Sequence, residues 1–258
     1  MFRNKPIIML GMLVVASMIL AACAPTQVVQ TVIVTEVIEG ETVEVIKVVT
    51  PTPEPAGPRT LVICQGQEPE TLYTYGGAML AMSHVLEAIF DGPIDSGSFA
   101  YQPVILQKLP SLADGDAVIQ AVTVAAGDTI VDADLNVATL EEGVKYLPSG
   151  CATAECAVEY AGGEVTMDQM VVTFQYLEGL LWSDGTPITT ADSLYAFNLA
   201  SDPDTPVGKY AIQRTASYEA LDDITIQWTG LPGYRDSTYF LNIWGPLPEH
   251  VWGQYTAA

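Results

Sequence analysis

The chain has 258 residues, of which 49% are hydrophobic and 16% are charged. Nine Lys and Arg residues stand against 31 Asp and Glu residues, which gives a formal net charge of −22. Such an acidic chain lacks the clustered cations that contact phosphate backbones, so nucleic acid is excluded as a partner, as is a basic helix on a membrane surface. The length is sufficient for one or two domains with a sizeable core.

The N-terminus has the pattern of a secretory signal. Arg3 and Lys5 precede an apolar run over residues 6–20, and small residues follow directly. A short cationic region, an apolar region and small residues before a cleavage point make up such a signal. The run is shorter than the roughly 20 residues that a bilayer-spanning helix needs. We therefore favour a removable signal over the alternative, an uncleaved transmembrane anchor.

The sequence Leu20-Ala21-Ala22-Cys23 resembles the lipobox of bacterial lipoproteins. This resemblance implies that residues 1–22 are a lipoprotein signal peptide and that Cys23 is the lipid attachment site. It also implies a protein held by its lipid anchor at the extracytoplasmic face of the cell membrane, in the periplasm or at the cell surface.

Residues 23–59 are predicted to form a tether. Residues 28–49 are rich in Val, Ile and Thr, and four prolines follow within residues 51–58. The prolines favour a stiff, extended polyproline II chain. The valine-rich stretch is compatible with an extended chain or with a hairpin about Gly40, since β-branched residues favour strands. Both alternatives remain open at this point.

The first elements expected after the tether indicate an α/β protein. Residues 60–65 (TLVICQ) form an unbroken apolar run, which predicts a short buried strand. Residues 78–90 have helical length and few breakers, and they end before Asp91-Gly92-Pro93. A loop rich in Gly and Tyr, residues 73–77, connects the two, and a strand, a loop and a helix in this order are typical of α/β folds.

Further elements are expected in the second half of the chain. Residues 119–147 contain several short strand candidates, and residues 171–177 and 224–228 are predicted as strands. A helix is predicted over residues 189–200, where Thr190 or Asp192 can accept hydrogen bonds from the free amides of the first turn.

The cysteines and histidines do not suggest a metal centre. Cys64 lies in the apolar run and is predicted to be a small buried core residue. Cys151 and Cys156 flank four residues in a glycine-rich segment, and we favour a disulfide between them over a metal site. His84 and His250 are predicted to be structural. We expect no metal and no cofactor.

Residues 132–136 (DADLN) match the first three ligand positions of an EF-hand calcium loop. Val137 stands where that loop needs Gly, however, and Gly143 stands where it needs a bidentate Glu. A polar hairpin turn is the better interpretation. The sequence also contains no Gly-x-Ser-x-Gly elbow, Walker loop or dinucleotide-binding fingerprint, so we do not expect an enzyme.

One segment resembles a family signature. Residues 171–193 read VVTFQYLEGLLWSDGTPITTADS, a strand, a Gly turn, a Trp-Ser-Asp-Gly-Thr-Pro motif and a helix start. This pattern resembles that of the family 5 solute-binding proteins, the peptide-binding components of ABC importers of the oligopeptide and dipeptide type. Residues 60–72, 221–228 and 246–252 match further family segments in the same order. The motif residues with an expected structural role are Trp182, Asp184, Gly185, Pro187 and Asp192.

The resemblance implies a type II periplasmic-binding-protein-like α/β fold, present here in incomplete form. Residues 60–258 would be its N-terminal part, with residues 60–91 and 246–258 in the first lobe and residues 92–245 in an inserted subdomain. Family members are longer and build a second lobe, which would be missing here. In the family's opening loop, Tyr73-Thr74 replaces the usual Asp-Pro, which leaves the geometry of that loop open.

The function implied is capture of a peptide or a similar small solute for ABC permease subunits, by hinge closure and without chemistry. A monomer is expected. The candidate ligand contacts are Tyr73, Tyr75, Gly76 and Gly77. Glycine permits close approach of the ligand to the backbone, and tyrosine offers an aromatic ring and a hydroxyl. The equal alternative is that this loop is an ordinary turn without a ligand. Other possibilities are nickel complexes, oligosaccharides or opines as ligands, a surface lipoprotein acting as a sensor or adhesion module, and, less favoured, an extracellular hydrolase.

Overall fold

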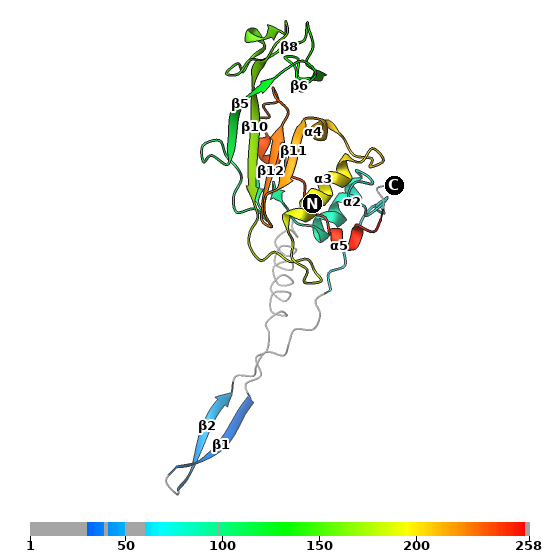
Figure 1. The fold of residues 1–258 in the computed structure, drawn as a ribbon. Helices are drawn as coiled ribbons and strands as arrows, with labels where there is room; N and C mark the ends of the chain where they lie inside the picture. Colours follow the sequence, from blue (N-terminus) through cyan, green and yellow to red (C-terminus); the bar gives the residue numbers. More distant parts are fainter. Residues whose placement is uncertain (1–29, 39–40, 50–59, 98, 256–258) are drawn as a thin grey trace, which may run out of the picture. The chain divides into compact units, whose positions relative to one another are not determined.

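The computed structural model describes residues 30–38, 41–49, 60–97 and 99–255 (Figure 1). The predicted signal peptide over residues 1–22, the predicted lipid attachment site Cys23 and the proline-rich part of the tether lie outside the described residues. The chain divides into two units, residues 1–64 and 65–258. Within the part that the structure describes, no helix has both the length and the apolar character needed to cross a membrane.

The first unit contains a β-hairpin. Strand β1 (Gln30–Ile38) pairs antiparallel with β2 (Glu41–Val49), so that Gln30 lies opposite Val49 and Ile38 opposite Glu41. Of the two alternatives for the valine-rich stretch, the structure therefore has the hairpin, as expected for consecutive β-branched residues.

The prediction of a buried strand over residues 60–65 is wrong. These residues form no strand, and Leu61, Val62 and Ile63 are 82%, 78% and 70% exposed. An apolar run becomes a strand only where a neighbouring strand pairs with its backbone groups, and no described strand pairs with this run. The prediction that Cys64 is buried is wrong for the same reason, because its free thiol is exposed.

A four-stranded antiparallel sheet forms the centre of the second unit, in the order β11-β12-β10-β5. The long central strand β10 (Val165–Gln175) pairs with β5 (Ala117–Val124) along its first part and with β12 (Thr225–Gly230) along its last part. The edge strand β11 (Thr215–Ala220) completes the sheet (Figure 1). The strands predicted over residues 171–177 and 224–228 are thus confirmed, although the first of them, β10, begins well before the predicted start, at Val165.

Two hydrophobic clusters hold the sheet. The larger one includes Phe174, Tyr176, Ile226 and Trp228, each with 0% exposure. The smaller one surrounds Met167 at the other end of β10. β10 alternates buried and more exposed positions only in part, because both of its faces are covered along much of its length.

Short hairpins and helices surround the sheet. The hairpins pair β3 (Ile94–Asp95) with β4 (Gln102–Pro103), β6 (Thr129–Val131) with β7 (Val137–Thr139), and β8 (Lys145–Tyr146) with β9 (Val158–Glu159). The helices are α2 (Leu80–Ile89), α3 (Thr190–Ser201), α4 (Tyr210–Gln213) and α5 (Glu249–Trp252), with short 3-10 turns at Ala154–Cys156 and Tyr239–Leu241. The predicted α/β class is confirmed.

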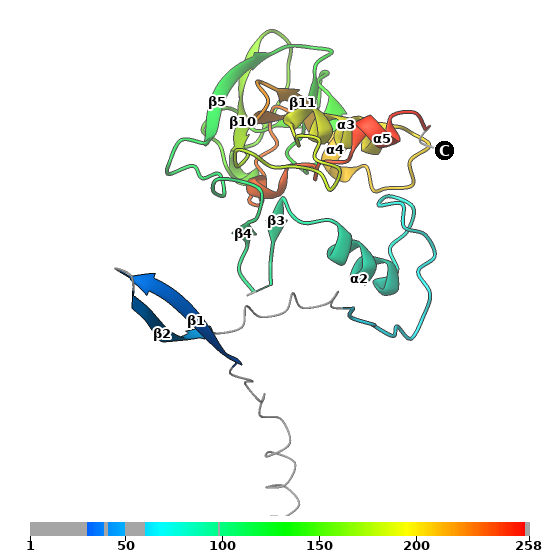
Figure 2. The ribbon, with the colours of Figure 1, turned by 90° about the horizontal axis from the view of Figure 1, so that it is seen from below.

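Helix α3 begins where the sequence predicts. The backbone N–H of Thr189, at the N-cap, donates to Oδ2 of Asp192 at 3.0 Å. Of the two predicted capping residues, Asp192 therefore supplies a carboxylate to the start of the helix. Helices α3 and α5 lie side by side (Figure 2), and the Leu247 N–H donates to the Asp192 carbonyl at 3.2 Å.

The acidic segment over residues 132–136 is a polar turn between β6 and β7, as predicted. Oδ1 of Asp132 accepts the backbone N–H groups of Asp134 (2.9 Å) and Asn136 (2.8 Å). Leu135 has a positive φ of 64°, which closes the turn. The first carboxylate of the apparent calcium motif is thus used to hold the backbone.

Cys151 and Cys156 form a disulfide, the pairing that the sequence favours. The bridge closes a loop with a sequence separation of 5, so its expected effect on unfolding is modest. Replacing both residues by serine should lower the free energy of unfolding by about 2 kcal/mol, because the unfolded chain regains loop entropy. Denaturant titration of the double variant measures this. Wild type under reducing agent should show the same loss, and an unchanged midpoint in both cases would contradict the prediction.

Candidate functional site

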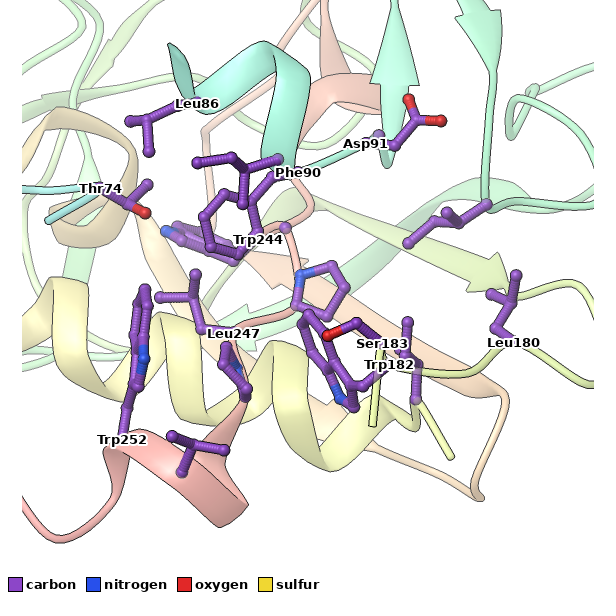
Figure 3. A pocket seen from close by; sticks show the side chains of 18 of the residues that line it. Thr74, Leu86, Phe90, Asp91, Leu180, Trp182, Ser183, Trp244, Leu247 and Trp252 are labelled. Atoms are coloured by element: carbon purple, nitrogen blue, oxygen red, sulfur yellow. The ribbon is translucent and has the colours of Figure 1, made fainter. Parts of the chain in front are cut away.

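A pocket of about 890 Å³ opens in the second unit (Figure 3). Most of its lining comes from four segments that are far apart in the sequence: residues 74–75, residues 86–92 at the end of α2, residues 180–188 after β10, and residues 243–252 up to α5. A volume of this size suits a small ligand or part of a peptide. The pocket is therefore the candidate functional site.

Aromatic side chains dominate the pocket. Trp182, Trp244 and Trp252 line it together with Phe90, and Figure 3 shows them around a common space. The rings of Phe90 and Trp252 meet edge to face, with centroids 6.0 Å apart. This contact joins the end of α2 to α5. Aromatic walls of this kind supply large apolar area with little conformational freedom to lose on binding.

The core behind the pocket positions Trp244. Its ring lies 4.7 Å from that of Phe197 and 4.8 Å from that of Tyr218, measured between centroids. The Trp244 backbone N–H donates to the Tyr218 hydroxyl oxygen at 3.2 Å, and the Ser193 hydroxyl donates to the Trp244 carbonyl. Helix α3 and strand β11 therefore determine where this side chain lies.

The family-like motif forms a tight turn that places Trp182. The Trp182 N–H donates to the Thr186 carbonyl at 2.8 Å, and the Gly185 N–H donates to the Trp182 carbonyl at 2.9 Å. Gly185 has a φ of 89°, a conformation that disfavours any side chain. Across the turn, Leu181 pairs with Pro187 in an isolated bridge.

The indole of Trp182 is also tied to helix α3. Its Nε1–H donates to Oδ2 of Asp192 at 3.3 Å, the same oxygen that accepts the Thr189 N–H. Because Asp192 is only 6% exposed, this hydrogen bond is shielded from water. Asp192 thus connects the start of α3 to one wall of the pocket.

An ion pair connects two segments of the pocket lining. Nε2 of His250, on α5, lies 2.8 Å from Oδ2 of Asp184, in the motif turn. The pKa of Asp184 is lowered to about 2, first because the Thr186 backbone N–H donates to Oδ1 at 2.9 Å and second because His250 donates to the carboxylate. Both groups are partly exposed, so the pair is screened by water.

This carboxylate should make stability depend on acid pH. Its pKa of about 2 in the folded chain lies below the ordinary value of 3.8, so its stabilisation is present above about pH 4 and is lost as the pH falls toward 2. Asp184→Asn should therefore lower the unfolding temperature at pH 6 and converge with wild type near pH 2. Thermal unfolding between pH 6 and pH 2 measures this, with Asp134→Asn at an exposed turn as the control. Parallel curves for wild type and Asp184→Asn would contradict it.

Only part of the loop predicted to contact the ligand lies at the pocket. Thr74 and Tyr75 line the pocket, whereas Tyr73, Gly76 and Gly77 are not among the lining residues. The Tyr75 hydroxyl donates to the Ala196 carbonyl of α3 at 3.3 Å, and burial raises the pKa of this hydroxyl. Tyr75 is thus engaged with the protein itself.

Contacts within the protein explain why Gly76 and Gly77 are glycines. The Gly76 N–H donates to the Tyr73 carbonyl at 2.8 Å, which makes a turn. A side chain at Gly77 would collide with Glu70, whose Oε1 accepts the Ala78 N–H at 3.0 Å. These observations favour the alternative of an ordinary turn for this part of the loop.

Sequence reasoning missed most of the pocket. It singled out Trp182 only for packing, and it did not select Phe90, Trp244 or Trp252. A signal was present, because residues 243–252 (IWGPLPEHVW) concentrate Trp and Pro in ten residues. His250 is exposed and pairs with Asp184, while His84 is exposed on α2 and does not line the pocket.

The pocket offers mainly apolar and aromatic surface. Ser183 also lines it, but among the described residues no hydrogen bond joins Ser183 to His250, as a nucleophile and its base would require. The described part of the chain likewise contains no group of three His, Cys, Asp or Glu residues placed to hold a metal ion. Fold and pocket together describe an α/β protein with a pocket lined largely by apolar and aromatic side chains.

Residues 152–254 match the family model of bacterial extracellular solute-binding proteins, family 5, middle region. Over these residues, the chain is similar to the middle region of the family 5 extracellular solute-binding proteins. The matched segment contains the motif turn, α3, β11, β12, α5 and the approach to α5, so the resemblance seen in the sequence is confirmed there. The family is one of binding proteins.

Two solved structures are distantly similar to this chain. An oligopeptide-binding protein from Thermus thermophilus, complexed with a pentapeptide, aligns with a TM-score of 0.43 and 16% identity over 68% of this chain and 22% of that chain. A protein from Clostridium difficile that is assigned as a peptide-binding protein aligns with a TM-score of 0.29 and 21% identity over 65% of this chain and 29% of that one. The chain thus spans less than a third of either structure. No curated protein matches it.

Proposed function

We propose that this chain is the solute-capturing component of an ABC importer. It binds a peptide, or a similar small solute, outside the cytoplasmic membrane and passes it to permease subunits without making or breaking a bond. The observation that carries this proposal is the family match over residues 152–254, which includes the complete motif turn from Trp182 to Asp192.

The pocket supports a binding role. Three tryptophans and a phenylalanine supply apolar area, and the hydroxyl of Thr74 and the imidazole of His250 stand among them. A ligand site of this kind gains free energy from apolar burial and uses a few polar groups for orientation. Peptides present both chemistries, since their side chains are often apolar and their backbone groups need hydrogen-bond partners.

The remaining parts of the proposal concern the chain's organisation. Residues 1–22 would be removed as a signal peptide, Cys23 would carry the lipid, and residues 24–59 would separate the anchor from the binding unit. Residues 60–91 and 246–258 would belong to one lobe and residues 92–245 to an inserted subdomain. With this division, both parts would contribute to the pocket lining, the lobe through residues 74–91 and 246–252 and the inserted subdomain through residues 180–188.

Calorimetric titration of the full chain with a mixture of tri- to pentapeptides tests the function. We expect saturable heat of binding with peptides, and none with oligosaccharides or with nickel complexes. Mass spectrometry of the recovered peptides should show them unchanged, as expected for binding without hydrolysis. Absence of binding to any peptide, or recovery of cleaved peptide, would overturn the proposal.

A further inference from the structure

The charged side chains that line the pocket are acidic, apart from one histidine. Among the described residues that line it, the acidic and basic side chains are Glu87, Asp91, Asp184 and His250, and none is Lys or Arg. His250 is paired with Asp184 at 2.8 Å. Glu87 and Asp91 form no ion pair with any described residue. The segment from Glu87 to Asp91, at the end of α2, therefore contributes two carboxylates without an ion-pair partner to the pocket lining.

The chain as a whole strengthens this asymmetry. Its formal net charge is −22, so the potential around the pocket is negative before any local group is considered. A ligand carboxylate in the pocket would meet repulsion from Glu87 and Asp91, with no Lys or Arg among the lining residues to pair with it and with His250 already engaged by Asp184. A ligand ammonium or guanidinium would be attracted by the same groups and would find indole faces nearby.

We propose, on the basis of the proposed function, that the pocket selects one class of peptide. It takes a bulky apolar side chain, aromatic or branched aliphatic, between Trp182, Trp244 and Trp252. The groups beside that side chain are neutral or cationic, and peptides with a carboxylate at those positions are rejected. Apolar burial supplies the affinity, and the charge of Glu87 and Asp91 supplies the discrimination.

The tryptophans themselves report the binding. The chain has four, of which Trp182, Trp244 and Trp252 line the pocket, while Trp228 is fully buried in the sheet core. Binding of an apolar side chain should shift the emission of the pocket tryptophans and leave that of Trp228 constant. Intrinsic fluorescence therefore gives a titration without any label.

The test compares three tripeptide amides: Lys-Phe-Lys, Lys-Ala-Lys and Glu-Phe-Glu. We expect Lys-Phe-Lys to bind about 30-fold more tightly than Lys-Ala-Lys, because a phenylalanine side chain buries much more apolar area than a methyl group. Glu-Phe-Glu should bind at least about tenfold more weakly than Lys-Phe-Lys. This second difference should shrink as salt is added, since ions screen partly exposed charges.

Matched variants assign the effects to the pocket. Trp252→Ala should abolish most of the preference for Phe over Ala, whereas Tyr255→Ala, at an aromatic residue that is 70% exposed and does not line the pocket, should preserve it. Trp252→Phe provides a milder change if the alanine variant does not fold. Glu87→Gln combined with Asp91→Asn should restore binding of Glu-Phe-Glu, and Glu219→Gln on β11 should not.

The outcomes separate the two proposals. If peptides bind but Phe and Ala are equivalent, or if Glu-Phe-Glu binds as tightly as Lys-Phe-Lys, the inference on specificity is overturned while peptide capture stands. Unchanged selectivity in Trp252→Ala and in the Glu87 and Asp91 double variant would overturn the assignment to this pocket. If no tripeptide or longer peptide binds, both proposals fail together.

Discussion

Replacing Trp228 by alanine should lower the free energy of unfolding by about 4 kcal/mol. The side chain has 0% exposure and lies on β12, opposite Val172 of β10 and opposite Tyr218 of β11. Its Nε1–H donates to the Thr215 hydroxyl at 2.8 Å. Removing the indole would leave a large cavity on the part of the sheet formed by β11, β12 and β10 and would deprive that hydroxyl of its donor.

Denaturant titration of Trp228→Ala measures this loss. Trp228→Phe keeps an aromatic ring but removes the donor, so it should cost less than the alanine change. Val118→Ala, at a position on the edge strand β5 that is 42% exposed, serves as the control and should cost well under half as much. A loss below about 1 kcal/mol for Trp228→Ala would mean that the sheet core is not organised around this side chain.

Replacing Asp192 by alanine should cost about 3 kcal/mol and should also weaken ligand binding. Oδ2 of this residue, which is only 6% exposed, accepts both the Thr189 N–H at 3.0 Å and the Trp182 Nε1–H at 3.3 Å. Without the carboxylate, the N-cap amide of Thr189 at the start of α3 and a shielded indole N–H both lose their acceptor. Trp182 would then be free to move within the pocket wall.

Two measurements separate these consequences. Denaturant titration reports the stability, and the fluorescence titration with Lys-Phe-Lys amide reports the position of Trp182. Asp192→Asn retains an oxygen acceptor and should keep much of the stability and of the affinity. Glu219→Ala, an exposed acid on β11, should change neither quantity. Equal losses in the Asn and Ala variants would show that the hydrogen bonds of Asp192 are not the cause.

The elements between residues 171 and 200 could be predicted well because their signals are local. Alternation of apolar residues indicates the end of β10, Gly185 permits the positive φ of the turn, and Asp192 stands at the third position of a helix, where a carboxylate reaches the N-cap amide. Each of these relations spans only a few residues. The family resemblance rests on the same segment and is confirmed over residues 152–254.

Local signals failed at residues 60–65. The run TLVICQ has the composition of a buried strand, but burial and pairing depend on which other strands lie beside it. In the structure none of the described strands pairs with it, and Leu61 and Cys64 are exposed. An apolar run therefore predicts a tendency to pair, and only the surrounding chain determines whether pairing occurs.

Composition and relations between near neighbours were enough to show the acidic character of this protein and to predict its α/β class and the motif turn, and the motif carries the resemblance to the family whose model matches residues 152–254. The folded chain was needed to show that Phe90, Trp182, Trp244 and Trp252 line one pocket and that Asp184 meets His250. Segments from both ends of the second unit converge there because packing on the sheet and α3 sets their positions, and no spacing in the sequence records that packing.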